Sequence, residues 1–242
     1  MTLIQSLILS VIQGFSEFLP ISSSGHLNLA QHYMGVRPSL ALDIFLNTAT
    51  LFSVLYFFRH QLSYFKNNLL YIIIGSLPAG LVGILLKTQI ETIFSNPKLL
   101  PFFFMITAGL VFLTKFAKEN GTKMDLRKAI VIGLFQAFAI LPGVSRAGST
   151  IFIGLMMGLT TQEAFNYSFS LFIPASLGAV LLGAKEIQGL SIQTGILSLS
   201  FVITLVVGIF ALSVLRGSLL AKKFWVFSIY ILLLALISFF TL

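Results

Sequence analysis

The sequence predicts an all-α polytopic membrane protein with an inverted-topology repeat, six transmembrane helices and two re-entrant helical hairpins. Composition is the first reason: of 242 residues, 57% are hydrophobic and 9% are charged, whereas soluble domains carry about 25% charged residues. Long charge-free runs separated by short basic loops are the second reason. Two apolar regions that are interrupted by proline, glycine and serine are the third. We expect a single membrane domain, residues 1–242.

Six apolar runs predict the transmembrane helices. A crossing needs about 20 apolar residues, with a range of roughly 17–25. The runs are residues 40–58, 69–86, 99–116, 164–184, 187–215 and 224–242. Asp43 stands near the start of the first run, and the fifth run is long enough for one tilted span with a lead-in.

Residues 1–35 and 129–158 do not fit simple crossings. The first region is broken at Pro20 and the serines that follow, and the second is broken at Pro142 and Gly143. Proline ends helices and glycine permits tight backbone turns, so each region predicts a hairpin of two half-helices. Irregular backbone at membrane depth is tolerated only inside protein or beside a water-filled cavity. We therefore expect both bends to line a cavity.

The basic residues predict the orientation. Loops 59–66, 115–128 and 216–223 carry more net positive charge than loops 87–98 and 185–188, in which Glu91 and Glu186 offset cations, and this places the three more basic loops in the cytoplasm. Both termini then face outward.

The net charge of +8 does not indicate nucleic-acid binding, because the cations lie in short loops between apolar runs. The chain has no cysteine, which excludes disulfides and thiolate metal sites. No charged segment precedes the first apolar run, so we expect Met1 to be retained near the mature N-terminus.

An internal repeat agrees with this orientation. An offset of 123 residues pairs Gln13 with Gln136, Phe15 with Phe138, Ser22 with Ser145, and Gly25 with Gly148. The predicted repeats are residues 1–122 and 123–242, each with one hairpin and three crossings. Because each repeat crosses the membrane an odd number of times, the second repeat must be inserted in the opposite orientation to the first. Inverted repeats with broken helices that meet near the midplane are a known transporter architecture.

Residues 13–26, QGFSEFLPISSSGH, place a carboxylate inside an apolar run. Gln13 and Glu17 are spaced i, i+4 and share a helix face. A carboxylate in such surroundings needs a metal ion, a cation or a proton, and charged groups inside membranes are usually functional. Glu17 is therefore a candidate metal ligand, with Gln13, or a general base. The alternative is a purely structural ion pair with Arg146.

The same stretch predicts a phosphate site. A half-helix is expected to start near Ser24, and free N–H groups at a helix start bind phosphate. Hydroxyls and backbone come from Ser22, Ser23, Ser24 and Gly25. Ordinary N-capping by serine is the alternative. His26, in the first turn, is a candidate nucleophile or general acid, or else a structural histidine.

Residues 142–150, PGVSRAGST, carry Arg146 as the only charge of the second bend. Its planar guanidinium suits bidentate phosphate binding. Ser145, Ser149 and Thr150 add hydroxyl groups. A phosphate site inside a bilayer fits a substrate with a phosphate head and a lipid tail. This predicts either a lipid phosphatase or a carrier that flips a phosphate lipid without hydrolysis. An ion channel is disfavoured, because no ring of repeated charges is present.

At these two stretches the chain resembles the undecaprenyl-diphosphate phosphatase family, also called the bacitracin-resistance family. That family carries [Glu/Gln]-x-x-x-Glu followed by Phe-Leu-Pro-x-Ser-Ser-x-Gly-His, which residues 13–26 match. Its second signature is Pro-Gly-x-Ser-Arg-Ser-x-x-Thr, which residues 142–150 match except at Ala147. The likeness covers essentially the whole chain. Gln13 is the family's option without a charge, so this site has one carboxylate fewer.

The resemblance implies that the terminal phosphate is removed from undecaprenyl diphosphate, a polyprenyl diphosphate lipid, to recycle the carrier for peptidoglycan synthesis. It implies a bacterial cell membrane, a site that opens outward, and a divalent cation, Mg²⁺ or Ca²⁺. Glu17 would be the essential acid and Arg146 the phosphate clamp, while Ser23 and His26 remain the two candidates for nucleophile or proton donor.

Overall fold

The computed structural model describes residues 1–36, 39–190 and 192–242, and their regular structure is entirely helical. Four helical segments are long and apolar enough to cross a membrane: Pro97–Phe116, Thr161–Leu182, Thr194–Leu220 and Phe224–Thr241. A fifth crossing arises if Leu69–Leu85 and Lys87–Phe94, which are bent by 77°, form one broken span. The chain is therefore a multi-pass helical membrane protein.

The predicted crossings correspond to helices with adjusted ends. These helices are α3 (Leu40–Phe57), α5 (Leu69–Leu85), α7 (Leu100–Leu113), α10 (Thr161–Leu182), α12 (Thr194–Leu220) and α13 (Phe227–Thr241). The run expected at 187–215 is shifted, because α11 (Ala184–Gln188) is a separate short helix and α12 continues to Leu220; residue 191 lies outside the described part. Short helices α4 (Leu62–Asn67) and α6 (Lys87–Phe94) fill two of the loops.

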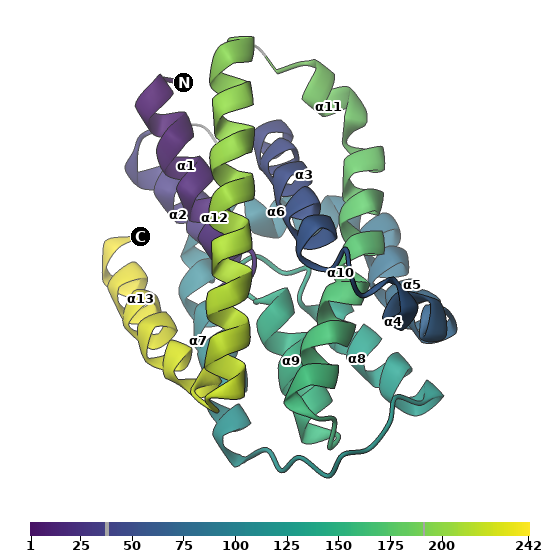
Figure 1. Cartoon of the computed structure of the whole chain (residues 1–242). Coiled ribbons are helices and arrows are strands. Elements are labelled where there is room, and N and C mark those ends of the chain that lie inside the picture. The colour runs from purple at the N-terminus through teal and green to yellow at the C-terminus, as the bar shows by residue number, and fades with distance from the viewer. Residues whose placement is uncertain (37–38, 191) are drawn as a thin grey trace.

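Both interrupted regions are helix pairs, as the sequence predicted. The first pair is α1 (Leu3–Ser16) with α2 (Ser23–Tyr33), and the second is α8 (Leu126–Phe138) with α9 (Arg146–Met156). In Figure 1 the first pair lies in the upper part of the molecule and the second in the lower part, with their broken ends near mid-height. The two bends thus approach each other from opposite ends.

Local sequence explains where these half-helices begin. Thr2 caps α1 through a capping box with Gln5. Asp125 caps α8 by accepting a hydrogen bond from the backbone N–H of Lys128, at 2.8 Å. The side chain of Lys128 also bonds to Asp125, and these bonds hold the pKa of this loop carboxyl below its usual value. Each pair therefore enters the bundle from a polar, capped end.

Small residues bring the half-helices close to the long helices. Helix α1 packs along α12, and α8 packs along α5. A Cβ on Gly14 of α1 would lie 2.7 Å from Val207 of α12, and a Cβ on Gly133 of α8 would collide with the backbone of Gly75 in α5. Small residues allow such close backbone approach in membrane helix pairs. Helix α12 also packs on α3, and α7 packs on α13.

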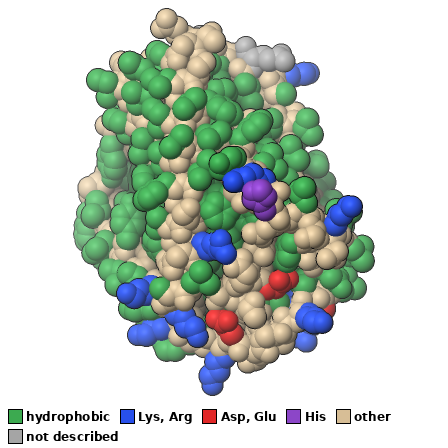
Figure 2. All heavy atoms as spheres, viewed as in Figure 1, with side chains coloured by type: hydrophobic (Ala, Val, Ile, Leu, Met, Phe, Trp, Pro, Cys, Tyr) green, Lys and Arg blue, Asp and Glu red, His purple; other side chains and the backbone are tan. Residues whose placement is uncertain are grey.

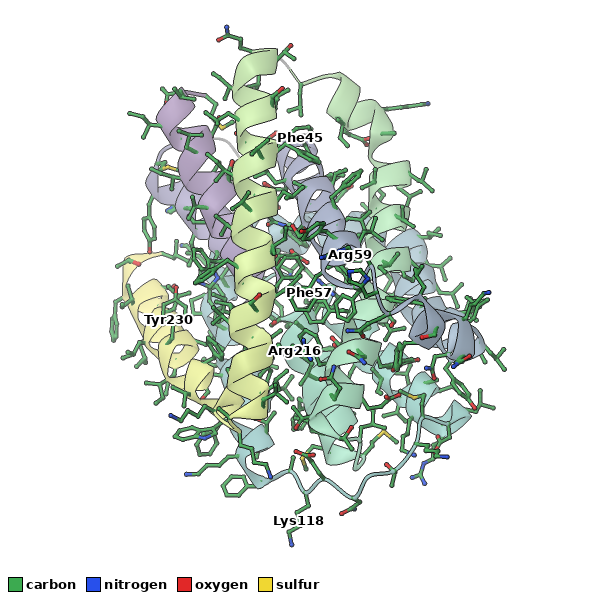
Figure 3. All side chains as sticks on the ribbon, in the orientation of Figure 1. Phe45, Phe57, Arg59, Lys118, Arg216 and Tyr230 are labelled. Carbon is green, nitrogen blue, oxygen red and sulfur yellow. The ribbon has the colours of Figure 1, made fainter. Side chains whose placement is uncertain are left out.

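The outer surface is that of a protein surrounded by lipid. On the face drawn in Figure 2, most of the hydrophobic side chains lie over the upper half, and most charged side chains lie over the lower half. Figure 3 places Lys118 at the lower end, pointing away from the protein, and Arg216 on the lower half of α12. Large hydrophobic side chains such as Leu181 and Phe240 are 76% and 83% exposed, which is the expected state of lipid-facing groups.

Candidate active site

The two bends are joined by an ion pair between Glu17 and Arg146. Glu17 follows the last residue of α1, and Arg146 is the first residue of α9. Nη2 of Arg146 donates to Oε1 of Glu17 at 2.5 Å, and the two side chains are 14% and 11% exposed. Residues 129 positions apart in the sequence therefore meet inside the bundle, as the sequence predicted.

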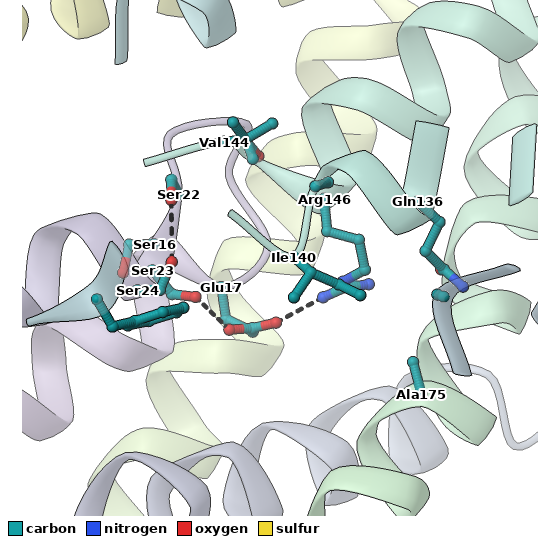
Figure 4. A pocket seen from close by; sticks show the side chains of 14 residues that line it. Ser16, Glu17, Ser22, Ser23, Ser24, Gln136, Ile140, Val144, Arg146 and Ala175 are labelled. Carbon is teal, nitrogen blue, oxygen red and sulfur yellow. Dashed lines mark hydrogen bonds and ion pairs between the residues drawn. The ribbon is translucent and has the colours of Figure 1, made fainter. Parts of the chain in front are cut away.

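The second oxygen of the same carboxylate accepts two more hydrogen bonds. The hydroxyl of Ser23 donates to Oε2 of Glu17 at 2.5 Å, and the amide nitrogen of Gln13 donates to it at 3.1 Å. Figure 4 shows Glu17 between the serines of the first bend and Arg146 of the second. Oε2 of Glu17 therefore lies in position to accept the proton of the Ser23 hydroxyl.

Two helix starts face this carboxylate. Ser22 caps α2, with its hydroxyl 3.4 Å from the backbone N–H of Gly25, and Ser145 caps α9, with its hydroxyl 3.1 Å from that of Gly148. Ser22 has a φ of 70°, which is uncommon for a residue other than glycine. Backbone strain of this kind gathers at functional sites. The partial positive charge of both helix starts favours an anion between them.

A cavity of about 210 Å³ lies at this junction. Six of the predicted site residues line it: Glu17, Ser22, Ser23, Ser24, Ser145 and Arg146. The other lining residues are Ser16, Ala79, Phe94, Gln136, Ala139, Ile140, Val144 and Ala175. The described lining thus combines one carboxylate and one guanidinium with serines, one amide and apolar side chains.

Comparison with known proteins shows the family of this chain. The model of a family described as bacitracin resistance protein BacA matches residues 6–237. The chain belongs to this family. Undecaprenyl-diphosphatases from three organisms are similar to it over most of their length. The one from Thermosipho africanus is 36% identical over 97% of this chain and 98% of its own length. The one from Methanobrevibacter smithii is 34% identical over 99% of this chain and 97% of its own length. The one from Rhodopirellula baltica is 40% identical over 87% of this chain and 86% of its own length.

His26 of this BacA-family chain makes contacts with the backbone of the first bend and with α13. Its Nδ1 lies 2.8 Å from the carbonyl oxygen of Ser22, which only accepts, so Nδ1 carries a proton. In the neutral ring, Nε2 then accepts from the hydroxyl of Tyr230 on α13, at 2.8 Å. The ring stacks on Tyr230 and meets Phe104 edge-on. His26 is not among the described residues that line the cavity, and its contacts hold the first bend against α13 and α7.

The predicted site residues Ser149 and Thr150 lie outside the cavity lining. Thr150 bonds to the carbonyl oxygen of Arg146 at 2.9 Å and shares a 2.6 Å hydrogen bond with Ser168 of α10. Ser149 is buried, and its hydroxyl has no hydrogen-bond partner within the described parts of the chain. Both lie near the start of α9.

Gly25 and Gly143 form the contact between the bends. A Cβ on Gly25 would lie 2.6 Å from the ring of Phe104 and 3.0 Å from Cα of Gly143, whose own φ is 91°. We expect Gly25→Ala to lower the unfolding free energy by about 1–3 kcal/mol, the usual cost of overpacking, and to lower the melting temperature in detergent. Gly109→Ala is the matched control, because nothing lies within 4 Å of its added Cβ. Equal melting temperatures for the two variants would contradict this contact.

Phe172 and Gln136 are site residues that were not assigned a role from the sequence. The guanidinium of Arg146 lies 4.1 Å from the ring centre of Phe172, a fully buried residue of α10. Phe172 stands in an apolar run rich in phenylalanine, so no sequence signal separates it from its neighbours. Gln136 appeared only as the repeat partner of Gln13.

The ring of Phe172 orients the guanidinium by a cation–π contact. Such a contact stabilises by about 0.5–2 kcal/mol, so we expect Phe172→Leu to raise the KM for a phosphate substrate by about 2–30-fold. Phe165→Leu, on the same helix and equally buried, serves as the control, because Phe165 packs against Phe58 rather than Arg146. A KM that rises equally in both variants would assign the effect to packing alone.

The donors for a divalent cation are few. Within the described residues, no group of three or more His, Cys, Asp or Glu side chains could hold a metal ion. Mg²⁺, however, is commonly bound by one or two carboxylates together with substrate phosphates and water. Glu17 supplies one carboxylate beside a phosphate-sized cavity, which fits that mode. Gln13 turns its amide nitrogen, which is not a metal donor, toward Glu17.

Proposed function

We propose that this chain is an integral-membrane phosphatase that removes the terminal phosphate of undecaprenyl diphosphate and recycles the carrier lipid for peptidoglycan synthesis. The observation that carries the proposal is the contact of Ser23, Glu17 and Arg146 in one cavity inside a membrane protein of the BacA family. A nucleophile, a base and an anion clamp are together there. The names of its relatives support the same substrate.

The contacts support Ser23 as the attacking group. Its oxygen attacks the terminal phosphorus while its proton passes to Oε2 of Glu17. The bond from that phosphorus to the bridging oxygen breaks, and the prenyl monophosphate leaves with the electron pair. Water then hydrolyses the phosphoserine, releasing phosphate and restoring the hydroxyl. Arg146 neutralises charge on the transferred group. His26 would hold the Ser22 backbone, rather than attack.

Glu17 would hold the divalent cation, Mg²⁺ or Ca²⁺, together with the phosphates of the substrate. The cation would supply charge neutralisation for the phosphoryl group. We expect an excess of chelator to lower phosphate release by at least about 100-fold, and added Mg²⁺ or Ca²⁺ to restore it. Phosphate release that continues unchanged in chelator, with the protein freed of metal beforehand, would remove the cation from this proposal.

The finer topology of the proposal has six crossings, two re-entrant pairs, outward termini and a cavity that opens outward from a bacterial cell membrane. The packing of the half-helices supports the inverted repeat. Helix α8 of the second repeat packs on α5 of the first repeat, and α1 of the first repeat packs on α12, which holds the corresponding position in the second repeat. Phe94, from the loop expected outside, lines the cavity, and its carbonyl oxygen accepts a 2.8 Å hydrogen bond from Asn28 of α2. These contacts support an opening toward that loop.

The test is phosphate release from a polyprenyl diphosphate by the purified protein in detergent. The expected result is stoichiometric phosphate and prenyl monophosphate. An absence of release across metals and pH values would overturn the proposal. Flipping without hydrolysis gains no support from the names of the relatives, and the Ser23–Glu17 contact is chemistry that a carrier does not need.

A further inference from the structure

Gln136 is a buried side chain that the chemistry above does not use. It lies on α8, is 2% exposed and lines the same cavity as Glu17 and Arg146. Neither its amide oxygen nor its amide nitrogen has a hydrogen-bond partner in the described parts of the chain. The large majority of buried side-chain polar atoms in folded proteins have a hydrogen-bond partner. A buried amide that lines a cavity with both ends unpaired therefore indicates a ligand there.

Its repeat partner shows what is unusual about it. Gln13 occupies the corresponding place in the first half-helix and gives its amide nitrogen to Glu17, four residues later. The residue four positions after Gln136 is Ile140, whose side chain cannot form a hydrogen bond. The second half thus keeps the glutamine without the carboxylate that engages it in the first half.

Arg146, which lines the same cavity, has a donor that is unpaired in the part of the chain that the structure describes. Its Nη2 is bound to Glu17, but its Nη1 is buried and has no partner among the described residues. In Figure 4, Gln136 lies on the side of Arg146 that is away from Glu17. The guanidinium N–H and the amide NH₂ are both donors, and an oxyanion between them would satisfy both.

The apolar surroundings indicate which of the two phosphates of the substrate would lie between Gln136 and Arg146. Ala79 of α5 and Ala175 of α10 line the cavity. The residues next to them, Gly80 and Pro174, line a second, apolar cavity of about 560 Å³ between the same two helices. A lipid whose tail follows α5 and α10 brings the phosphate attached to that tail past this wall, while its terminal phosphate reaches Ser23.

We propose that Gln136 and Nη1 of Arg146 form a second phosphate subsite, which binds the phosphate that stays on the prenyl chain and so selects a diphosphate over a monophosphate. This inference rests on the proposed function. Gln136 is here a binding residue that contacts the uncleaved phosphate, whereas Ser23 and Glu17 act on the terminal one. Arg146 lies between the two phosphates, so that Nη1 binds the uncleaved one while the positive charge of the guanidinium also neutralises the terminal one. The division explains why one small cavity holds two separate sets of donors.

Gln136→Met tests the subsite, since methionine keeps the length of the side chain and removes both polar atoms. We expect the KM for a polyprenyl diphosphate to rise at least about tenfold, with kcat changed less than about threefold. We also expect the affinity of the purified protein for inorganic pyrophosphate to fall by at least about tenfold while its affinity for inorganic phosphate stays within about twofold. A merely structural role would weaken the two anions alike.

Ser200→Ala is the control, because that hydroxyl is also buried and without a partner in the described chain but lies on α12, outside the cavity lining. It should leave KM and both anion affinities within about twofold of wild type. If Gln136→Met does not fold, Gln136→Glu has the same shape and places a negative charge at the subsite, so its KM should rise further. Equal losses for both anions, or a fall in kcat at constant KM, would overturn the subsite. Wild-type protein that releases no phosphate but binds pyrophosphate through Gln136 would overturn the phosphatase and keep the subsite.

Discussion

Glu17→Gln is expected to lower the kcat of phosphate release by about 10²–10⁴-fold, the usual contribution of a positioned general base. Oε2 of Glu17 accepts a 2.5 Å hydrogen bond from the hydroxyl of Ser23, and a glutamine amide in its place could not take the proton in the proposed step. Glutamine has the same size and can still accept from Arg146, so the bends should stay together. Release of phosphate from a polyprenyl diphosphate in detergent measures the loss, and the melting temperature checks the fold.

Glu163→Gln is the matched control for Glu17. Glu163 lies in the first turn of α10, accepts a 2.8 Å hydrogen bond from Tyr64 and does not line the cavity. The same removal of charge there should leave kcat within about twofold. A Glu17→Gln protein that keeps wild-type kcat would show that the carboxylate is structural, which is the alternative that the sequence left open.

Combining this change with Ser23→Ala tests whether the two residues act as a unit. Residues that share one proton transfer lose activity non-additively, because the first change already removes the step. The double variant should therefore be about as slow as the slower single variant. Independent roles for Ser23 and Glu17 would instead multiply the two losses, and a Ser23→Ala protein with near wild-type kcat would return the attack to His26 or water.

The sequence predicted the meeting of Glu17 and Arg146 for a physical reason. A single carboxylate and a single guanidinium in two apolar, helix-breaking stretches are costly to bury apart, and each is the other's natural partner. The helix starts were predictable for the same kind of reason, since a serine after a break caps the next helix. Ser22 and Ser145 do so, within two residues of the expected start near Ser24 in the first case.

Contacts between distant helices could not be predicted in this way. The direction of His26 depends on Tyr230, 204 residues later, and on the ring of Phe104. The cation–π contact of Phe172 with Arg146 depends on how α10 is rotated against α9, which an apolar run does not encode. The 77° bend after Leu85 also lacked a clear signal, because the residues on both sides of it favour helix. Periodicity and helix breakers fix local elements, whereas packing decides which face meets which.

Arg146→Lys is expected to lower kcat/KM by about 10³–10⁵-fold, the range found when an arginine that stabilises a transferring phosphoryl group is removed. Lysine keeps the positive charge, so the ion pair with Glu17 and the fold should survive better than in Arg146→Ala, where a buried carboxylate loses its partner at a cost of about 3–5 kcal/mol. Steady-state kinetics on a polyprenyl diphosphate, with the melting temperature beside it, separates the two effects.

The size of this loss follows from what lysine cannot reproduce. A single ammonium cannot contact Glu17 through one nitrogen and a phosphate through a second one in a fixed plane, and it lacks the planar group that lies 4.1 Å from the ring centre of Phe172. Arg216 lies on α12 and does not line the cavity, so Arg216→Lys should change kcat/KM less than about twofold. If Arg146→Lys is nearly as active as wild type, a point charge is sufficient at the second bend, and both the clamp and its second phosphate subsite lose their geometric basis.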